Sequence, residues 1–238
     1  MEITKREVIT SIAIIAIMLT IGFLIGDKIE DHQNDKNAKY WKAEQINDPE
    51  LFQYGMDTSA GNAFIYGTLQ AEDPVTYKEI GGKYMYIEKV EEHYTMHTRT
   101  VTTGSGTHRH TRVEHYWTWD RAGSEDKTCK NVKFLGIQFD SSKVKMPDPD
   151  YIETIEESSR VRYKYYGVKA KVKGTMFTKM SKGTISDKSD FYQGKEIEET
   201  VEKLTSGAGV VVFWVMWIIV TALAVIGFYY LDNNWLNT

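Results

Sequence analysis

Residues 210–231 read VVVFWVMWIIVTALAVIGFYYL, an uncharged and almost wholly apolar run. As a helix the run would be about 33 Å long, enough to cross a bilayer core about 30 Å thick. Aromatic rings stand at both ends, and such amphipathic rings favour the headgroup level. The residues predicted to anchor the helix at the interfaces are Trp214, Trp217, Tyr229, Tyr230 and Trp235. The alternative, a buried core helix, is disfavoured because the run is apolar on every face.

A second uncharged run, residues 8–25, reads VITSIAIIAIMLTIGFLI. As a helix it would measure about 27 Å, near the lower limit for crossing a bilayer. A cleaved signal peptide is the rival interpretation, and it requires a small-x-small site after the apolar run. Residues 24–30, LIGDKIE, offer no such site, so the sequence favours an uncleaved signal anchor.

Two spans would place both ends of the chain on the same side of the membrane. Lys5 and Arg6 favour a cytoplasmic N-terminus, so the domain between the spans is predicted to be extracytoplasmic. Gly22 and Gly26 form a G-x-x-x-G motif, a spacing that lets two helix backbones approach closely. Glycine is common in membrane helices, so the motif by itself does not establish packing; the second span and another copy of the chain are the two candidate partners.

The residues between the spans predict a β-rich domain. Residues 27–43 are polar and are interpreted as a helical or frayed stalk. After the stalk, β-branched and aromatic residues alternate in short runs, as half-buried strands require. The runs are residues 62–69, 83–90, 131–139 and 160–173.

Two short helices are also predicted. Glu153 follows Asp150 in a capping-box-like spacing, which indicates a helix over residues 150–159. Residues 196–204 have an amphipathic pattern that predicts another helix.

The predicted fold class is therefore α+β, a β-rich soluble domain with a long projecting β-hairpin, flanked by two transmembrane α-helices. The predicted parts are an N-terminal tip and span (1–27), the β-rich domain (28–207), and the second span with a short tail (208–238).

Residues 84–119 predict the long hairpin. Gly104 and Gly106 bracket Ser105, which is a turn signal, so the tip is placed at Ser105. In this register Tyr94 faces Tyr116, and threonine and arginine fill both faces near the tip. Neither face can then be buried, and the hairpin is predicted to project as an interaction arm. The residues assigned to the arm are Thr98, Arg99, Thr100, Thr103, Ser105, Arg109 and Arg112. The aromatic cluster predicted to anchor it is Tyr84, Tyr86, Trp117 and Trp119.

Five of the six histidines lie in this hairpin. In the predicted register His93, His97 and His115 share one face, and three imidazoles on one face could bind zinc. The favoured alternative is an exposed polar ribbon in which histidine is one polar residue among many. A pH-sensitive arm is a third interpretation, because histidine titrates between about pH 5 and 8.

Several function classes are disfavoured by the sequence. The formal net charge of −4 and the pI of about 5.9 give no electrostatic reason to expect nucleic-acid binding. Cys129 is the one cysteine, so it forms no intrachain disulfide and no metal cluster by itself; pairing with another chain is the less favoured alternative to a partly buried thiol. Phosphate-loop, dinucleotide-binding, zinc-protease and nucleophile-elbow motifs are missing from the sequence. We therefore expect no enzymatic activity and no cofactor.

Two family resemblances follow from these patterns. Residues 67–69 (GTL), 84–93 (YMYIEKVEEH) and 167–174 (GVKAKVKG) resemble the "beside-a-membrane" architecture of GIDE-type membrane E3 ligases. The sequence has no RING domain, so ligase activity is not implied. Residues 3–7, 94–101, 116–120, 123–127, 163–167 and 227–233 are similar to a family of two-span proteins of Gram-positive gut bacteria and their prophages. That resemblance implies a bacterial cytoplasmic membrane and brings no activity with it.

The function predicted from the sequence is that of a non-enzymatic integral membrane protein whose tethered β domain mediates protein–protein interaction or self-assembly at the cell envelope. Its expected partners are the lipid bilayer and a protein or another copy of the chain, without nucleic acid. The alternative is a membrane-bound metal-binding or pH-sensing protein that uses the hairpin histidines. A transporter or channel component is disfavoured because neither span carries an intramembrane charge.

Overall fold

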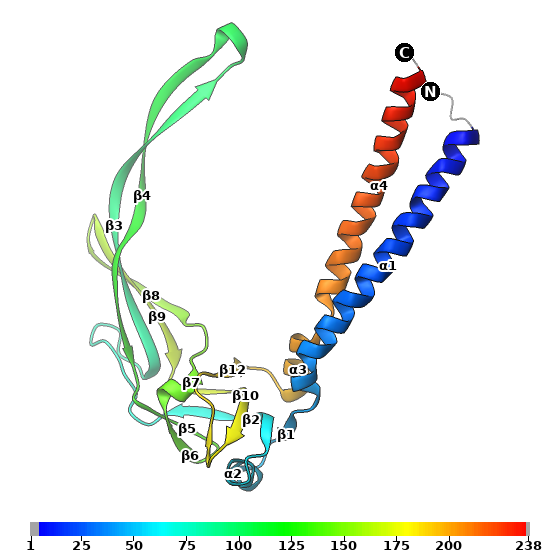
Figure 1. Ribbon diagram of the computed structural model, residues 1–238. Helices are drawn as coiled ribbons and strands as arrows, with labels where there is room; N and C mark the ends of the chain where they lie inside the picture. Colours follow the sequence, from blue (N-terminus) through cyan, green and yellow to red (C-terminus); the bar gives the residue numbers. More distant parts are fainter. Residues whose placement is uncertain (1–4, 237–238) are drawn as a thin grey trace. The chain divides into compact units, whose positions relative to one another are not determined.

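The computed structural model describes residues 5–236, apart from the side chains of Thr107 and residues 233–236 (Figure 1). The chain divides into two compact units. The helical unit contains residues up to 42 and from 201 onward, and the β unit contains residues 43–200. The predicted class, α+β and β-rich with two long apolar helices at the ends, is confirmed.

The helical unit is built from α1 (Lys5–Trp41) and α4 (Ala208–Leu236), which lie side by side (Figure 1). Both helices are long and apolar enough to cross a membrane. Their most apolar segments are 11% and 0% buried, so the rest of the described chain does not cover them as it would cover a core helix. α1 continues without a break beyond residue 27, so the predicted stalk is helical as far as Trp41.

A short amphipathic helix, α3 (Ile197–Thr205), precedes α4. It matches the helix predicted over residues 196–204. Its first turn carries Glu198 and Glu199, whose charges favour a helix N-terminus. Ile197 and Thr200 are its buried residues.

Two sheets form the β unit, and their pairing is antiparallel except at β1 with β2 and at β7 with β12. Within the described residues, one sheet has eight strands, in the order β6-β5-β2-β10-β12-β7 with β1 beside β2 and β11 beside β10, and the other has four, in the order β4-β3-β9-β8. The first sheet contains β1 (Glu44–Ile46), β2 (Gly61–Ala71), β5 (Asn131–Phe134), β6 (Ile137–Asp140), β7 (Val144–Lys145), β10 (Lys171–Ser181), β11 (Thr184–Ile185) and β12 (Ser189–Gln193). The second contains β3 (Tyr84–Thr103), β4 (His110–Thr128), β8 (Asp150–Ser158) and β9 (Val161–Lys169).

The predicted strand runs fall on strands, and turns divide two of them. The run over residues 131–139 is split into β5 and β6 by Leu135 and Gly136, which both have positive φ, as a two-residue hairpin turn requires. The run over residues 160–173 is divided between β9 and the start of β10. Residues 62–69 lie within β2, and residues 84–90 lie within β3.

The main core of the β unit lies under α2 (Pro49–Asp57), a helix that the sequence analysis did not predict. The Asp48 side chain caps α2 by accepting hydrogen bonds from the backbone N–H groups of Glu50 and Leu51. Phe52 of α2 is fully buried, and its ring meets the rings of Phe134 and Phe139 at centroid distances of 5.9 and 6.1 Å.

The helix predicted over residues 150–159 is wrong, because these residues form strand β8. A register shift around Ile152 makes the strand irregular where it pairs with β9. Ile152 and Ile155 both pack on the small cluster of Tyr77, Ile87 and Tyr165. The shift therefore lets residues three apart share one face of a strand, a spacing otherwise typical of a helix.

Candidate functional site

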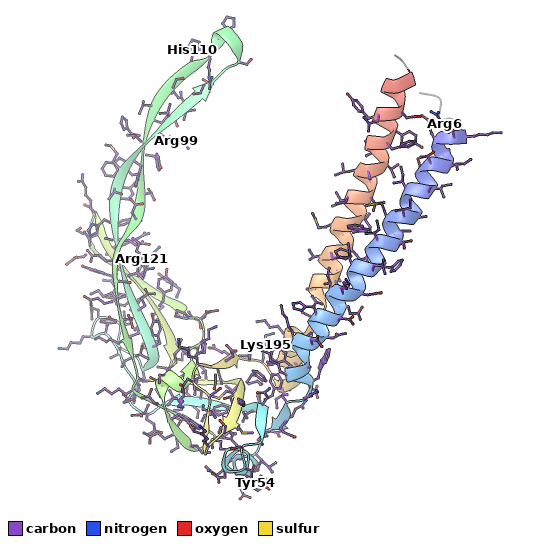
Figure 2. All side chains as sticks on the ribbon, viewed as in Figure 1. Arg6, Tyr54, Arg99, His110, Arg121 and Lys195 are labelled. Carbon is purple, nitrogen blue, oxygen red and sulfur yellow. The ribbon has the colours of Figure 1, made fainter. Side chains whose placement is uncertain are left out.

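The outer half of the β3–β4 pair is a two-stranded ribbon. Pairing of β3 with β9 ends at His93 and Val161, whereas pairing of β3 with β4 continues from Tyr94 and Trp119 to Thr103 and His110. We call residues 94–103 and 110–119 the ribbon; Figure 2 labels Arg99 along it and His110 near its end. In the described chain, the two strands of the ribbon pair only with each other, so no further strand covers their outer edges.

The register differs from the predicted one. Residues 104–109 form the connection and include a short 3₁₀ turn at Gly106–His108. Gly104 has φ +88°, and a Cβ atom there would collide with the carbonyl oxygen of His108. Tyr94 therefore pairs with Trp119 rather than Tyr116, a shift of three positions. Because side chains alternate between faces, an odd shift reverses the faces on one strand relative to the other.

The grouping of three histidines on one face, on which the less favoured zinc interpretation depended, is wrong for this reason. His115 pairs with Thr98, which lies on the face opposite to His93 and His97. Among the residues that the structure describes, no group of three or more His, Cys, Asp or Glu side chains could hold a metal ion.

His93 and His97 each lie beside a carboxylate instead. His93 Nε2 is 2.6 Å from Glu91 Oε1, and His97 Nε2 is 2.5 Å from Asp120 Oδ2. Hydrogen bonds from the Thr95 hydroxyl and then from His97 hold the pKa of Asp120 below its usual value. Within the described residues, each of these two histidines therefore has a single carboxylate partner, at the base of the ribbon, and all four side chains are partly exposed.

The corrected register gives the ribbon two unlike faces. Directly paired residues lie on the same side of a sheet, so the pairing assigns each side chain to a face. Within the described ribbon, one face carries no Asp, Glu, Lys or Arg, and we call it the uncharged face. It consists of Tyr94, Met96, Thr98, Thr100, Thr102, Thr111, Val113, His115, Trp117 and Trp119.

The opposite face carries the ion pairs. Glu114 accepts from Arg99 Nη2 at 2.8 Å and from Arg112 Nη2 at 2.5 Å. Hydrogen bonds from Arg99 and then Arg112 lower the pKa of Glu114. The prediction that arginine lies on both faces is therefore wrong, since the strand arginines share one face.

The residues assigned to the interaction arm are all exposed, and they are divided among three places. Thr98 and Thr100 belong to the uncharged face. Arg99, Thr103 and Arg112 belong to the opposite face, and Ser105 and Arg109 flank the 3₁₀ turn.

An aromatic cluster stands at the base of the uncharged face. The ring of Tyr94 lies 5.3 Å from that of Trp117 and 5.1 Å from that of Trp119. The guanidinium of Arg160 lies 5.4 Å from the Trp117 ring, and that of Arg162 lies 4.1 Å from the Trp119 ring. Tyr84 and Tyr86, predicted to join this cluster, pair instead with Lys169 and Thr128 at the other end of the strands. Tyr94 was missed because the predicted β3–β4 register was wrong, and the two arginines were missed because no pairing of β9 with β3 was predicted.

Below the aromatic cluster, Glu92 holds two cations. Its side chain is 14% exposed and lies 2.6 Å from Arg162 Nε and 3.0 Å from Lys164 Nζ. Burial acts to raise the pKa of Glu92, but the hydrogen bonds from Lys164 and Arg162 lower it on balance. Glu92 therefore ties β3 to β9 at the point where the ribbon begins.

Replacing Glu92 with glutamine is expected to lower the free energy of unfolding by about 1–2 kcal/mol at pH 7, because two cations lose their counter-charge. The folded pKa of Glu92 lies below the unfolded value, so its stabilisation is present above about pH 4.3 and is lost as the pH falls through the folded pKa. Denaturant unfolding should thus show that the difference in unfolding free energy between the wild type and Glu92→Gln becomes smaller in acid. The control is Glu125→Gln on β4. A free-energy difference between the wild type and Glu92→Gln that is the same at pH 7 and pH 3 would contradict the expectation.

The glycines of the G-x-x-x-G motif lie against α4. Trp217 Nε1 donates a hydrogen bond to the carbonyl oxygen of Met18 at 2.9 Å. A Cβ at Gly22 would lie 2.7 Å from Trp217 Cδ1, and a Cβ at Gly26 would lie 3.5 Å from a ring carbon of Trp214. Indole rings of α4 thus fill the space over the two glycines of α1.

The predicted interface anchors have different surroundings. Trp214 and Trp217 are partly buried against α1, as just described, whereas Tyr230 is exposed. Tyr229 is partly buried, and the side chain of Trp235 lies outside the described residues. At the same end of the pair, Arg6 donates two hydrogen bonds to the Asp232 carboxylate at 2.9 and 2.8 Å.

Cys129 is 1% exposed. Burial, and then the charge of Asp73, raises the pKa of its thiol to about 11. A protonated, buried thiol reacts poorly, which disfavours a bond to another chain.

Comparison of the chain with protein-family models, with curated proteins and with solved structures found no match.

Proposed function

We propose that this chain is a non-enzymatic, two-span membrane protein that displays its β unit outside the cytoplasm and uses the ribbon to bind a protein partner or another copy of itself. The observation that carries the proposal is the ribbon, which extends beyond any packed core while presenting large apolar side chains.

The membrane assignment is supported by the surface of the helical unit. Apolar side chains such as Ile9, Ile12 and Val211 are more than half exposed in the described chain. Such an apolar surface is stable in lipid. A helix can be placed there because its backbone hydrogen bonds are satisfied within the helix itself. Lys5 and Arg6 favour the cytoplasm for the end of the helix pair at which Arg6 contacts Asp232.

The binding role is supported by the exposure of the ribbon. Met96, Val113 and Trp117 are 54%, 61% and 43% exposed. Two-stranded hairpins are marginally stable alone, and they gain stability when another surface covers an apolar face. An exposed apolar face on a projecting ribbon is typical of an interaction site.

The test is to shorten the ribbon while keeping its base. His97 and Tyr116 are paired, so replacing residues 98–115 with Asn-Gly should close a two-residue turn on that pair. We expect the variant to keep the melting temperature of the β unit but to lose self-association and partner capture by the tagged full chain in detergent. The matched control replaces residues 104–109 with a Gly-Ser linker of equal length and should retain binding.

Unchanged oligomeric state and unchanged capture in the shortened variant would contradict the proposed function. Repeating the capture at pH 5.5 examines the pH-sensing alternative, which rests on His97 beside Asp120. A pH effect that disappears in His97→Gln would favour that alternative.

A further inference from the structure

The two edges of the four-stranded sheet are protected to different degrees. β8 is one edge, and it is interrupted by two register shifts and carries Asp150, Glu153, Glu156 and Glu157. Such bulges and charges prevent a strand from pairing with another chain. Strand β4 is the other edge.

The bulge that protects β4 lies in its inner part. There the register shifts at Ala122, which is skipped between Gly123 and Arg121 in the pairing with β3. Residues 110–119 read HTRVEHYWTW and contain no proline, glycine or lysine, and their described pairing with β3 has no register shift. Over this length β4 has the features of a strand that can accept another strand on its outer edge.

The charges on this edge suit pairing with an identical strand. Arg112 and Glu114 have opposite charges and stand on either side of Val113. In an antiparallel pair of two β4 strands centred on Val113, Arg112 of each copy lies opposite Glu114 of the other. Opposite charges in directly facing positions stabilise a strand pair, and here the favourable contact occurs twice.

The edge of β3 offers no such match. Between Thr95 and Thr103 its charged residue is Arg99, and the segment contains no acidic residue to face it. A β3–β3 pair would therefore lack the complementary contacts that a β4–β4 pair makes.

We infer that a second copy of this chain docks on the outer edge of β4, with residues 110–116 of the two copies paired antiparallel about a two-fold axis at Val113. This inference rests on the proposed function and names the partner of the ribbon. The pair joins the two four-stranded sheets, and it makes the uncharged faces continuous, with Val113 beside Val113 and Thr111 beside His115. An isologous contact of this kind closes as a dimer. Anchoring both copies in one membrane raises their effective concentration.

Charge reversal tests this register. Full-length chains with two different tags are co-expressed, and one tag is captured while the other is quantified. Arg112→Glu paired with itself, and Glu114→Arg paired with itself, should each show co-capture reduced about tenfold, because both facing contacts become repulsive. Arg112→Glu paired with Glu114→Arg should restore co-capture to near the wild-type level, since each contact again joins opposite charges.

Cysteine cross-linking gives a second readout that does not depend on charge. Val113→Cys should form a disulfide-linked dimer in membranes under mild oxidation, because the two residues face each other at the axis. The native Cys129 is buried and should not contribute. The control is Glu156→Cys on the opposite edge strand, which should remain monomeric.

Co-capture that is equal in all pairings, or a Val113→Cys chain that cross-links no more than Glu156→Cys, would overturn the inference. If a charge-reversal variant failed to fold, it would fail both alone and in the mixture of the two variants. Restored co-capture in the mixture would therefore show that the single variants lost pairing and not folding. If ribbon shortening abolishes capture of a different protein while the chains do not co-capture each other, the inference fails and the proposed function stands. If shortening has no effect, both fail.

Discussion

Replacing Gly22 with leucine is expected to separate α1 from α4. The indole of Trp217 occupies the space above Gly22, where an added side chain would collide with it. The hydrogen bond from Trp217 Nε1 to Met18 would also be lost. We expect the helix pair to be destabilised by about 2–3 kcal/mol, from overpacking together with the lost hydrogen bond.

Cross-linking between the helix ends measures this effect. Arg6 and Asp232 form an ion pair, so cysteines at these two positions should be joined by a short bifunctional maleimide. Adding Gly22→Leu should lower the SDS concentration at which cross-linking fails. The matched control is Gly227→Leu in α4, where nothing lies within 4 Å of the added Cβ. Equal SDS resistance of the two leucine variants would show that α1 and α4 do not pack as described.

Replacing Phe52 with alanine is expected to have the largest effect on the β unit. The side chain is fully buried, and it contacts the rings of Phe134 and Phe139 across the main core. Truncation would leave a cavity that α2 can only partly close, so we expect a loss of about 3–5 kcal/mol. For a domain of this size such a loss is a large fraction of the total stability.

The neighbouring residue provides the control. Leu51 precedes Phe52 in α2 and is 56% exposed. Leu51→Ala should change the unfolding free energy by less than about 0.5 kcal/mol. Denaturant unfolding of both full-length variants, followed by far-UV circular dichroism, makes the comparison. Similar losses in the two variants would mean that α2 does not cover the core.

The long apolar helices could be predicted from the sequence because their signal is local and strong. Each run is uncharged over the length of a bilayer, and no tertiary contact is needed to explain it. Helix α3 was predicted for the same reason, from its amphipathic spacing. The runs containing β2, β9 and the start of β10 were recognised from their alternation.

The ribbon register could not be predicted, since it depends on backbone geometry at both ends of the pair. The connection uses six residues with a 3₁₀ turn rather than a tight turn at Ser105, and Ala122 is skipped near the base. The error of three positions grouped His115 with His93 and His97 and thereby created the zinc hypothesis. A shift by an even number would have left the faces intact.

Two other errors have different causes. In β8 the capping-box-like spacing of Asp150 and Glu153 suggested a helix, but pairing with β9 outweighs this local preference. Helix α2 was missed although its signal is present, because Asp48 and Pro49 are typical N-cap and first-turn residues. The sequence therefore contained enough information to find α2 and too little to place β8.

Thiol labelling of intact cells tests the central claim most directly. The variant Ser105→Cys places a reactive thiol at the end of the ribbon, and a separate variant carries a cysteine added after Thr238. If both long helices span the membrane with the β unit outside, a membrane-impermeant maleimide should label Ser105→Cys in intact cells. The cysteine added after Thr238 should be labelled only after the cells are lysed. Protection of Ser105→Cys until lysis, or recovery of the chain in the soluble fraction, would contradict the account.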